Sequence, residues 1–262
     1  MAEAAALLME EAPAVVYIFV FLFGIVVGSF LNVCIYRLPK HESIVVVPSH
    51  CMTCGKKLHW YELFPLFSWL ALRGKCLGCK APISPQYPII EASNGVLWLV
   101  AVFALGLTPD AILCQLLLST LLVIAIIDAR TKEIPFSLNI FIGVLALIRL
   151  ALHYTDWKEY VIGLGVIGGL FLIIFLVSGG AAMGGGDVKL MLACGLFLGI
   201  KAGVVALVIA CISACVIHLI LMKVKHLGRQ LAFGPYLAGG IGLAALWGTQ
   251  IASWYLNTFF TF

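Results

Sequence analysis

Residues 160–177 form an apolar run without a single charged side chain, and this strongly limits how the chain can fold. About 20 consecutive apolar residues are enough for a helix to cross the hydrocarbon core of a bilayer. Similar runs recur along the 262 residues, of which 63% are hydrophobic and 11% are charged, whereas soluble domains have about 25% charged residues. Because a soluble protein of this length cannot bury so much apolar surface, we expect an all-α polytopic membrane protein.

Hydropathy predicts about eight membrane-spanning helices. They cover residues 14–36, 88–107, 110–128, 136–152, 160–178, 187–200, 202–222 and 235–257. The sixth is short, and it follows a glycine-rich break of a kind tolerated where the backbone lines a protein cavity. Alternatively, residues 187–222 form one bent helix and a re-entrant piece.

The basic residues predict the orientation of these helices, because Lys and Arg are enriched on the cytoplasmic side. If the loop at 37–87 is cytoplasmic, thirteen of the 16 Lys and Arg residues lie on that side, and Arg149, Lys158 and Lys201 lie on the other. Both termini would then be non-cytoplasmic. The first twelve residues contain Glu but no Lys or Arg, whereas a secretory signal begins with positive charge. We therefore expect a non-cytoplasmic tail at 1–13 and a retained first helix at 14–36, in the cytoplasmic (inner) membrane.

Several functional classes are disfavoured by the sequence. The net charge of +4 is spread beside the apolar spans and does not form one basic patch, so nucleic acid is not an expected partner, whereas membrane lipid is. The chain has no phosphate-binding G-x-x-x-x-G-K-[ST] loop and no internal repeat. Its six histidines form neither a Ser–His–Asp arrangement nor an H-E-x-x-H motif, which argues against a serine protease or a zincin.

The predicted cytoplasmic insert at 37–87 holds two cysteine pairs, Cys51/Cys54 and Cys76/Cys79. Twenty-one residues separate the pairs, a spacing typical of four-thiolate zinc sites. We expect Gly55 and Gly78 to form the tight turns of two metal-binding knuckles. A disulfide or redox pair is the alternative, and the reducing cytoplasm disfavours it. Structural zinc would help so small an insert to fold, so we predict a zinc-ribbon-like domain.

We interpret the other five cysteines as small buried hydrophobic residues.

Two aspartates are predicted to reach the same membrane face. Asp128 ends the third apolar span and Asp187 begins the sixth, so both arrive at the cytoplasmic ends of their helices. Two carboxylates about 4 Å apart repel by about 4 kcal/mol at an effective dielectric constant of about 20. One of them then keeps a proton while the other acts as a base toward water, as in aspartic proteases. In the alternative interpretation each aspartate caps a helix or pairs with a nearby cation, Asp187 with Lys189 and Asp128 with Arg130.

Four further residues are candidates for positioning a substrate. Gly184 and Gly186 precede Asp187 and allow the backbone to turn and to approach a neighbour or a substrate closely, and Lys189 follows it. Glu91 lies just inside the second span, where a lone carboxylate needs a partner such as Arg37. Its role is either structural or substrate-orienting.

These motifs together resemble the type IV prepilin peptidases, a family of membrane aspartyl proteases with a GxGD motif. The resemblance covers most of the chain. It rests on Gly28-Ser29-Phe30-Leu31-Asn32 with Tyr36-Arg37-Leu38-Pro39, the two cysteine pairs, Asp128 with Ile134-Pro135, the segment Gly184 to Leu190, and Phe233-Gly234-Pro235.

The resemblance implies that the chain cleaves a short basic leader from prepilins or pseudopilins on the cytoplasmic side. It also implies that the chain N-methylates the new terminus with S-adenosylmethionine. Asp128 and Asp187 would be the catalytic pair, and the four insert cysteines would bind zinc. Residues 37–87 are too short for an ordinary methyltransferase domain, so we expect the methyl-donor site between the zinc loop and the membrane. Phe136 departs from the family pattern, which has Asp or Asn after Ile-Pro, and we expect this to affect helix capping.

The sequence therefore predicts a transmembrane aspartyl protease core at 88–262 behind the zinc-binding loop. Three rival hypotheses are a transporter with a zinc-binding cytoplasmic module, an assembly subunit whose zinc loop docks partners, and a broader intramembrane aspartyl protease that cuts within helices. The sequence alone does not indicate the oligomeric state.

Overall fold

The computed structural model describes residues 9–225 and 232–259, and within these ranges the secondary structure is helical apart from two isolated β-bridges. Helices suit a bilayer because each satisfies its own backbone hydrogen bonds away from water. Residues 1–8 of the predicted N-terminal tail, and residues 226–231 before the last predicted span, lie outside the described ranges.

Five described helical segments are long and apolar enough to cross a membrane: Pro13–Lys40, Gln86–Leu105, Pro109–Thr131, Tyr154–Val177 and Gly185–Ile217. Helix Phe136–Leu152 is apolar but shorter. The predicted all-α, multi-pass membrane fold is therefore confirmed, whereas the count of eight spans is not.

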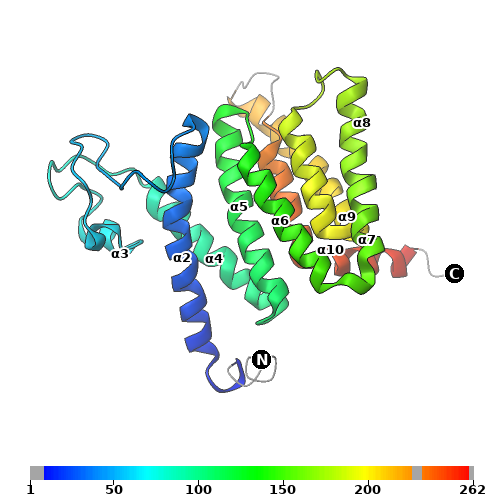
Figure 1. The fold of residues 1–262 in the computed structure, drawn as a ribbon, viewed down its shortest axis with the longest axis horizontal. Coiled ribbons are helices and arrows are strands. Elements are labelled where there is room, and N and C mark those ends of the chain that lie inside the picture. Colours follow the sequence, from blue (N-terminus) through cyan, green and yellow to red (C-terminus); the bar gives the residue numbers. More distant parts are fainter. Residues whose placement is uncertain (1–8, 226–231, 260–262) are drawn as a thin grey trace. The chain divides into compact units, whose positions relative to one another are not determined.

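The chain forms two compact units, residues 1–119 and 120–262. The described part of the first unit contains α2 (Pro13–Arg37), the 3-10 helices η1 (Leu38–Lys40) and η2 (Trp60–Leu63), α3 (Phe67–Ala71), α4 (Gln86–Leu105) and the start of α5 (Pro109–Thr131). In the sequence, the segment that carries the cysteine pairs connects the end of α2 to the start of α4 (Figure 1).

Helices α2 and α4 lie side by side because small residues let their backbones approach each other (Figure 1). A Cβ atom on Gly24 would lie 2.7 Å from the Cα of Gly95, and one on Gly28 would lie 2.7 Å from the Cα of Glu91. The buried Asn94 amide donates to the Gly24 carbonyl at 2.7 Å. The same side chain accepts a hydrogen bond of 2.7 Å from Ser119, so this buried polar group is satisfied.

The second unit begins within α5 and is built around α9. It contains α6 (Phe136–Leu152), η3 (Tyr154–Asp156), α7 (Trp157–Gly163), the π-helical η4 (Leu164–Gly168), α8 (Gly169–Val177), α9 (Gly185–Lys225) and α10 (Gly234–Phe259). Helix α9 packs against α6, α7, η4, α8 and α10, and its buried side chains include Leu190, Met191 and Phe197.

A break at Gly199 interrupts α9, where the backbone has φ of 73° and ψ of −178°. Essentially only glycine adopts this conformation. The guanidinium of Arg149 on α6 donates to the Phe197 carbonyl at 3.1 Å and lies 4.7 Å from the centre of the Phe197 ring. This contact satisfies a carbonyl beside the helix break, where an unsatisfied group in a membrane would be costly. The sequence predicted a boundary between spans close to this position.

Candidate functional site

Asp128 lies in the last turn of α5 and is buried, with 5% of its surface exposed. Its Oδ2 accepts a hydrogen bond of 2.8 Å from the backbone N–H of Gly234, the first residue of α10. The N-terminus of a helix carries partial positive charge and unpaired N–H groups, so it stabilises a carboxylate. This contact offsets the unfavourable position of Asp128 at the C-terminal end of its own helix.

Asp187 lies in the first turn of α9, where the helix dipole favours a negative charge. Its backbone N–H donates to the Gly184 carbonyl at 3.1 Å, and its side chain is buried. Among the described residues, its Oδ1 has no hydrogen-bond partner. A buried carboxylate oxygen of this kind is available to a water molecule or a substrate.

Asp128 and Asp187 line one cavity of about 280 Å³ in the second unit. The cavity is also lined by three other predicted site residues and four neighbours: Gly184, Gly186, Lys189, Lys132, Glu133, Ile134 and Gly185. The Nζ of Lys189 lies 4.7 Å from the centre of the Phe136 ring, where a cation is attracted to the π face. Phe136 begins α6, and no side chain caps that helix. The structure thus brings the two predicted aspartates together with three of the four predicted positioning residues.

Gly234 was not predicted as a site residue, although the motif Phe233-Gly234-Pro235 was noted. A Cβ at position 234 would lie 2.6 Å from the Asp128 Oδ2, closer than any real contact allows. The signal in the sequence was a glycine beside a proline, which suits the first turn of a helix, where the backbone N–H groups have no partner within the helix and are available to an anion.

The four insert cysteines form one cluster, as predicted. Their Sγ atoms all lie within 4.8 Å of one another, and those of Cys51 and Cys79 are 3.9 Å apart. Four sulfurs at about 2.3 Å from a tetrahedral zinc ion would be about 3.8 Å apart, so the arrangement can hold a metal ion. The backbone N–H groups of Cys54 and Thr53 lower the pKa of the Cys51 thiol to about 6, which favours the thiolate that metals bind.

The two knuckles share one backbone pattern. Cys51 N–H donates to Lys56 O, and Cys76 N–H donates to Ala81 O, both at 2.9 Å. In each knuckle the residue after the second cysteine has positive φ, 71° at Gly55 and 60° at Lys80. Gly78 lies within the turn of the second knuckle, as predicted, and Gly55 has the left-handed conformation in the first. In the second knuckle the left-handed residue is Lys80 and not Gly78.

The other cysteines differ in exposure. Cys34, Cys114 and Cys194 are buried, as predicted. Cys211 and Cys215 are exposed, so the prediction that they are buried is wrong. They lie on a face of α9 that also exposes Ile212 and Val216, and a lipid-facing helix surface accepts apolar thiols as readily as aliphatic side chains.

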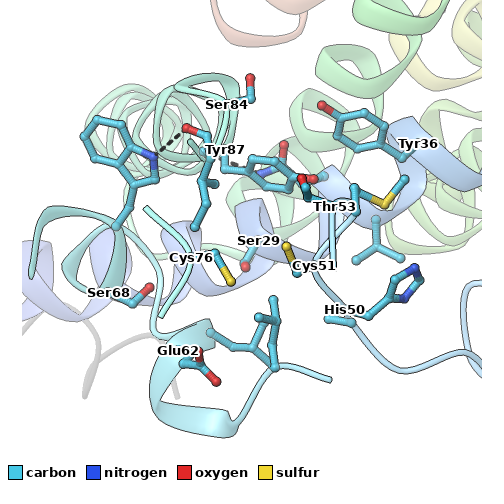
Figure 2. Close-up of a pocket in the computed structure, with 18 of the residues that line it drawn as sticks. Ser29, Tyr36, His50, Cys51, Thr53, Glu62, Ser68, Cys76, Ser84 and Tyr87 are labelled. Carbon is cyan, nitrogen blue, oxygen red and sulfur yellow. Dashed lines mark hydrogen bonds between the residues drawn. The ribbon is translucent and has the colours of Figure 1, made fainter. Parts of the chain in front are cut away.

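Glu91 lies in the first unit and not with the aspartates. It is buried, and its Oε2 accepts a hydrogen bond of 2.8 Å from the Leu66 N–H. The predicted partner, Arg37, instead donates to the carbonyls of Ser43 and Val47. Glu91 lines a second cavity of about 650 Å³, whose other walls include Tyr36, Tyr87, Cys51 and Cys76 (Figure 2).

Comparison with protein families matches two models to this chain. Residues 22–105 match the bacterial peptidase A24 N-terminal domain, and residues 115–219 match the type IV leader peptidase family. This chain belongs to the type IV leader peptidase family.

Relatives of this leader peptidase family member match along most of its length. The prepilin leader peptidase/N-methyltransferase of Aeromonas salmonicida (strain A449) is 34% identical over 290 residues, covering 96% of this chain and 99% of the relative. The proteins of the same name from Pseudomonas aeruginosa and Bacillus subtilis (strain 168) are both 31% identical, and the alignments cover 90% of this chain and 92% and 96% of those relatives. No solved structure is a significant match to the chain.

Proposed function

We propose that this membrane protein is a prepilin leader peptidase that also N-methylates the terminus it creates. Support comes from its family membership and from relatives that carry both activities in their names over nearly the same length. The substrates would be prepilins or pseudopilins. The distribution of Lys and Arg supports cleavage at the cytoplasmic face of the inner membrane, with both termini on the opposite side.

The observation that carries the peptidase assignment is the single cavity lined by Asp128 and Asp187. In the proposed mechanism, one carboxylate accepts a proton from water as that water attacks the scissile carbonyl. The other carboxylate, protonated at that stage, donates a hydrogen bond to the carbonyl oxygen. The Gly234 N–H would keep Asp128 oriented, and the unpartnered Oδ1 of Asp187 would face the water or the substrate.

The remaining predicted residues take supporting roles in this proposal. Gly184 and Gly186 line the cavity without side chains and so leave room for an extended peptide beside Asp187. Lys189 would attract a peptide carbonyl or carboxylate. In the insert, zinc would be the ion bound by the four cysteines, because four thiolates at tetrahedral spacing are typical of structural zinc.

The test compares leader removal by purified wild-type protein with that by three variants, using a prepilin in detergent and reading the product mass. Asp128→Asn and Asp187→Asn keep the side-chain shape but remove the charge, so we expect cleavage to fall below detection. Glu133→Gln is the matched control, because Glu133 lines the same cavity but is exposed. We expect it to cleave at close to the wild-type rate.

Two outcomes would overturn the proposal. Cleavage at the wild-type rate by either Asp→Asn variant would exclude the catalytic pair. Failure of folded, metal-loaded wild-type protein to cleave several prepilins would exclude the peptidase. Ion flux in liposomes would then support the transporter alternative, and full retention of pilus or secretion assembly by both variants would support the assembly subunit.

A further inference from the structure

The larger cavity of the first unit has the size and position of a small-molecule site. Its volume is about 650 Å³, within the range of about 300–1,000 Å³ that ligand pockets occupy. One helical stripe on α2 supplies Ser29, Asn32 and Tyr36, and another on α4 supplies Tyr87 and Glu91. Spacings of three or four residues place the members of each stripe on one face of their helix. The cysteine knuckles supply another part of the wall (Figure 2).

The cavity lies where the close contact between α2 and α4 ends. At Gly28 the two backbones approach so closely that a Cβ would clash with Glu91. Two turns further along α2, the residue facing α4 is Tyr36, whose ring stacks on that of Tyr87 with centroids 5.6 Å apart and planes at 18°. Large rings in place of glycine keep the helices apart and present aromatic surface to the cavity.

The groups around this cavity are suited to a cation with a flat ring. Glu91 is buried, and among the described residues its hydrogen-bond partners are neutral groups, the Leu66 N–H and the Ser29 side chain. A buried carboxylate without a positive partner is costly, and a cationic ligand would lower that cost. The faces of the nearby tyrosine rings also attract cations and stack with planar bases.

A further unsatisfied group lies on the α2 stripe. Asn32 is 2% exposed, and its amide nitrogen donates to the Tyr87 carbonyl at 3.2 Å. Its Oδ1 has no hydrogen-bond partner among the described residues. An N–H donor on a bound ligand would satisfy this oxygen.

We propose that this cavity binds S-adenosylmethionine, with Glu91 facing the sulfonium, the Tyr36–Tyr87 pair stacking on the adenine, and Asn32 accepting a ligand N–H. The inference rests on the proposed function, which requires a methyl donor. The ligand supplies a methyl group on a positively charged sulfur, and the S–C bond breaks with its electron pair left on sulfur as the N–C bond to the pilin amine forms. The chain's own contribution is to hold the cation beside Glu91, a carboxylate able to take up the proton that the amine releases.

The test measures binding of S-adenosylmethionine and of its neutral product, S-adenosylhomocysteine, to the full-length protein by equilibrium dialysis. Glu91→Gln keeps an oxygen for the Leu66 N–H but removes the charge. We therefore expect the ratio of the two affinities to shift about tenfold against S-adenosylmethionine. Tyr36→Leu removes one ring of the pair proposed to stack on the adenine, so both ligands should weaken while their ratio stays unchanged. Glu11→Gln removes an exposed carboxylate that does not line the cavity and should change neither value.

Leader cleavage and metal content of the same preparations show that each variant is folded, because neither depends on Glu91 in this proposal. An unchanged affinity ratio in a cleaving Glu91→Gln protein would overturn the inference while leaving the proposed function intact. If the wild-type protein cleaves prepilin but neither binds S-adenosylmethionine nor methylates the product, the proposed methyl transfer is wrong, and so is this inference. A wild-type protein that does not cleave would instead contradict the proposed peptidase.

Discussion

Gly234 and Asp128 are 106 residues apart in sequence, yet the Gly234 N–H donates to the Asp128 Oδ2 at 2.8 Å, in a space too small for a side chain at position 234. The contact joins the end of α5 to the start of α10. It fixes one oxygen of a proposed catalytic carboxylate by a backbone group that no rotamer change can withdraw.

The first prediction is that Gly234→Ala lowers the rate of leader removal at least tenfold. The added Cβ would displace the Asp128 carboxylate, and a hydrogen bond to a charged group contributes about 1.5–3 kcal/mol. Initial cleavage rates at saturating prepilin measure the effect. Gly239→Ala is the matched control in the same helix, because a Cβ there meets nothing within 4 Å. Equal rates for the two variants would show that the contact does not orient the carboxylate.

The second prediction separates the three glycines before Asp187. A Cβ at Gly186 would lie 3.1 Å from the Ile134 Cβ, whereas the nearest atom to a Cβ at Gly185 is 3.8 Å away, on the Phe175 ring. We therefore expect Gly186→Ala to slow cleavage severalfold by displacing the start of α9, and Gly185→Ala to have little effect.

Gly184→Ala tests the approach of the substrate, because its Cβ would meet Asp187 Oδ2 only at an ordinary 3.5 Å. If the peptide passes over this position, as proposed, the variant should raise the KM for prepilin with a smaller effect on kcat. Unchanged KM and kcat in Gly184→Ala would mean that the substrate does not pass over Gly184. The glycine segment 184–186 would then act only through the packing of Gly186 against Ile134.

Much of this arrangement could be predicted from the sequence, because it depends on local patterns. Hydrophobic runs predicted the helices, and the spacing of Cys51, Cys54, Cys76 and Cys79 predicted the cluster that the structure contains. The left-handed conformation of Lys80 was not predicted, since a lysine gives no sequence signal for positive φ. The contact of Gly234 with Asp128 and the neutral partners of Glu91 depend on packing between distant segments, which periodicity and spacing do not encode.

The third prediction concerns the break in α9. Gly199→Ala would put a Cβ on a residue with φ of 73° and ψ of −178°, at 3.0 Å from the Glu159 Cγ. Strain of about 1–3 kcal/mol is expected for a non-glycine residue in this region, so the variant should unfold at a lower temperature in detergent. Gly165→Ala is the control, because its Cβ meets nothing within 4 Å. Equal melting temperatures for Gly199→Ala and Gly165→Ala would mean that α9 adjusts its backbone at residue 199 without a loss of stability.

The fourth prediction concerns metal binding. Cys51→Ser or Cys76→Ser should remove most of the zinc from the purified protein, as measured by elemental analysis. The insert should also become sensitive to trypsin, because a small domain without its metal loses much of its folding free energy. Cys215→Ser, a change at an exposed cysteine in α9 outside the cluster, should keep its zinc. Wild-type protein prepared without chelators and containing no zinc would contradict the assignment of the metal.

The last prediction uses the equivalence of Gly55 and Lys80, the residues that follow the second cysteine of each knuckle and have φ of 71° and 60°. A left-handed conformation costs a non-glycine residue about 1–2 kcal/mol, and glycine avoids this cost. Lys80→Gly should therefore strengthen zinc retention against a chelator, and Gly55→Lys should weaken it, each by about fivefold for about 1 kcal/mol. No atom lies within 4 Å of a Cβ at Gly55, so the second change tests backbone strain without a clash. Lys57→Gly, outside the left-handed positions, controls for the loss of a positive charge from the insert. If Lys80→Gly and Lys57→Gly change zinc retention equally, charge and not backbone conformation determines the difference between the knuckles.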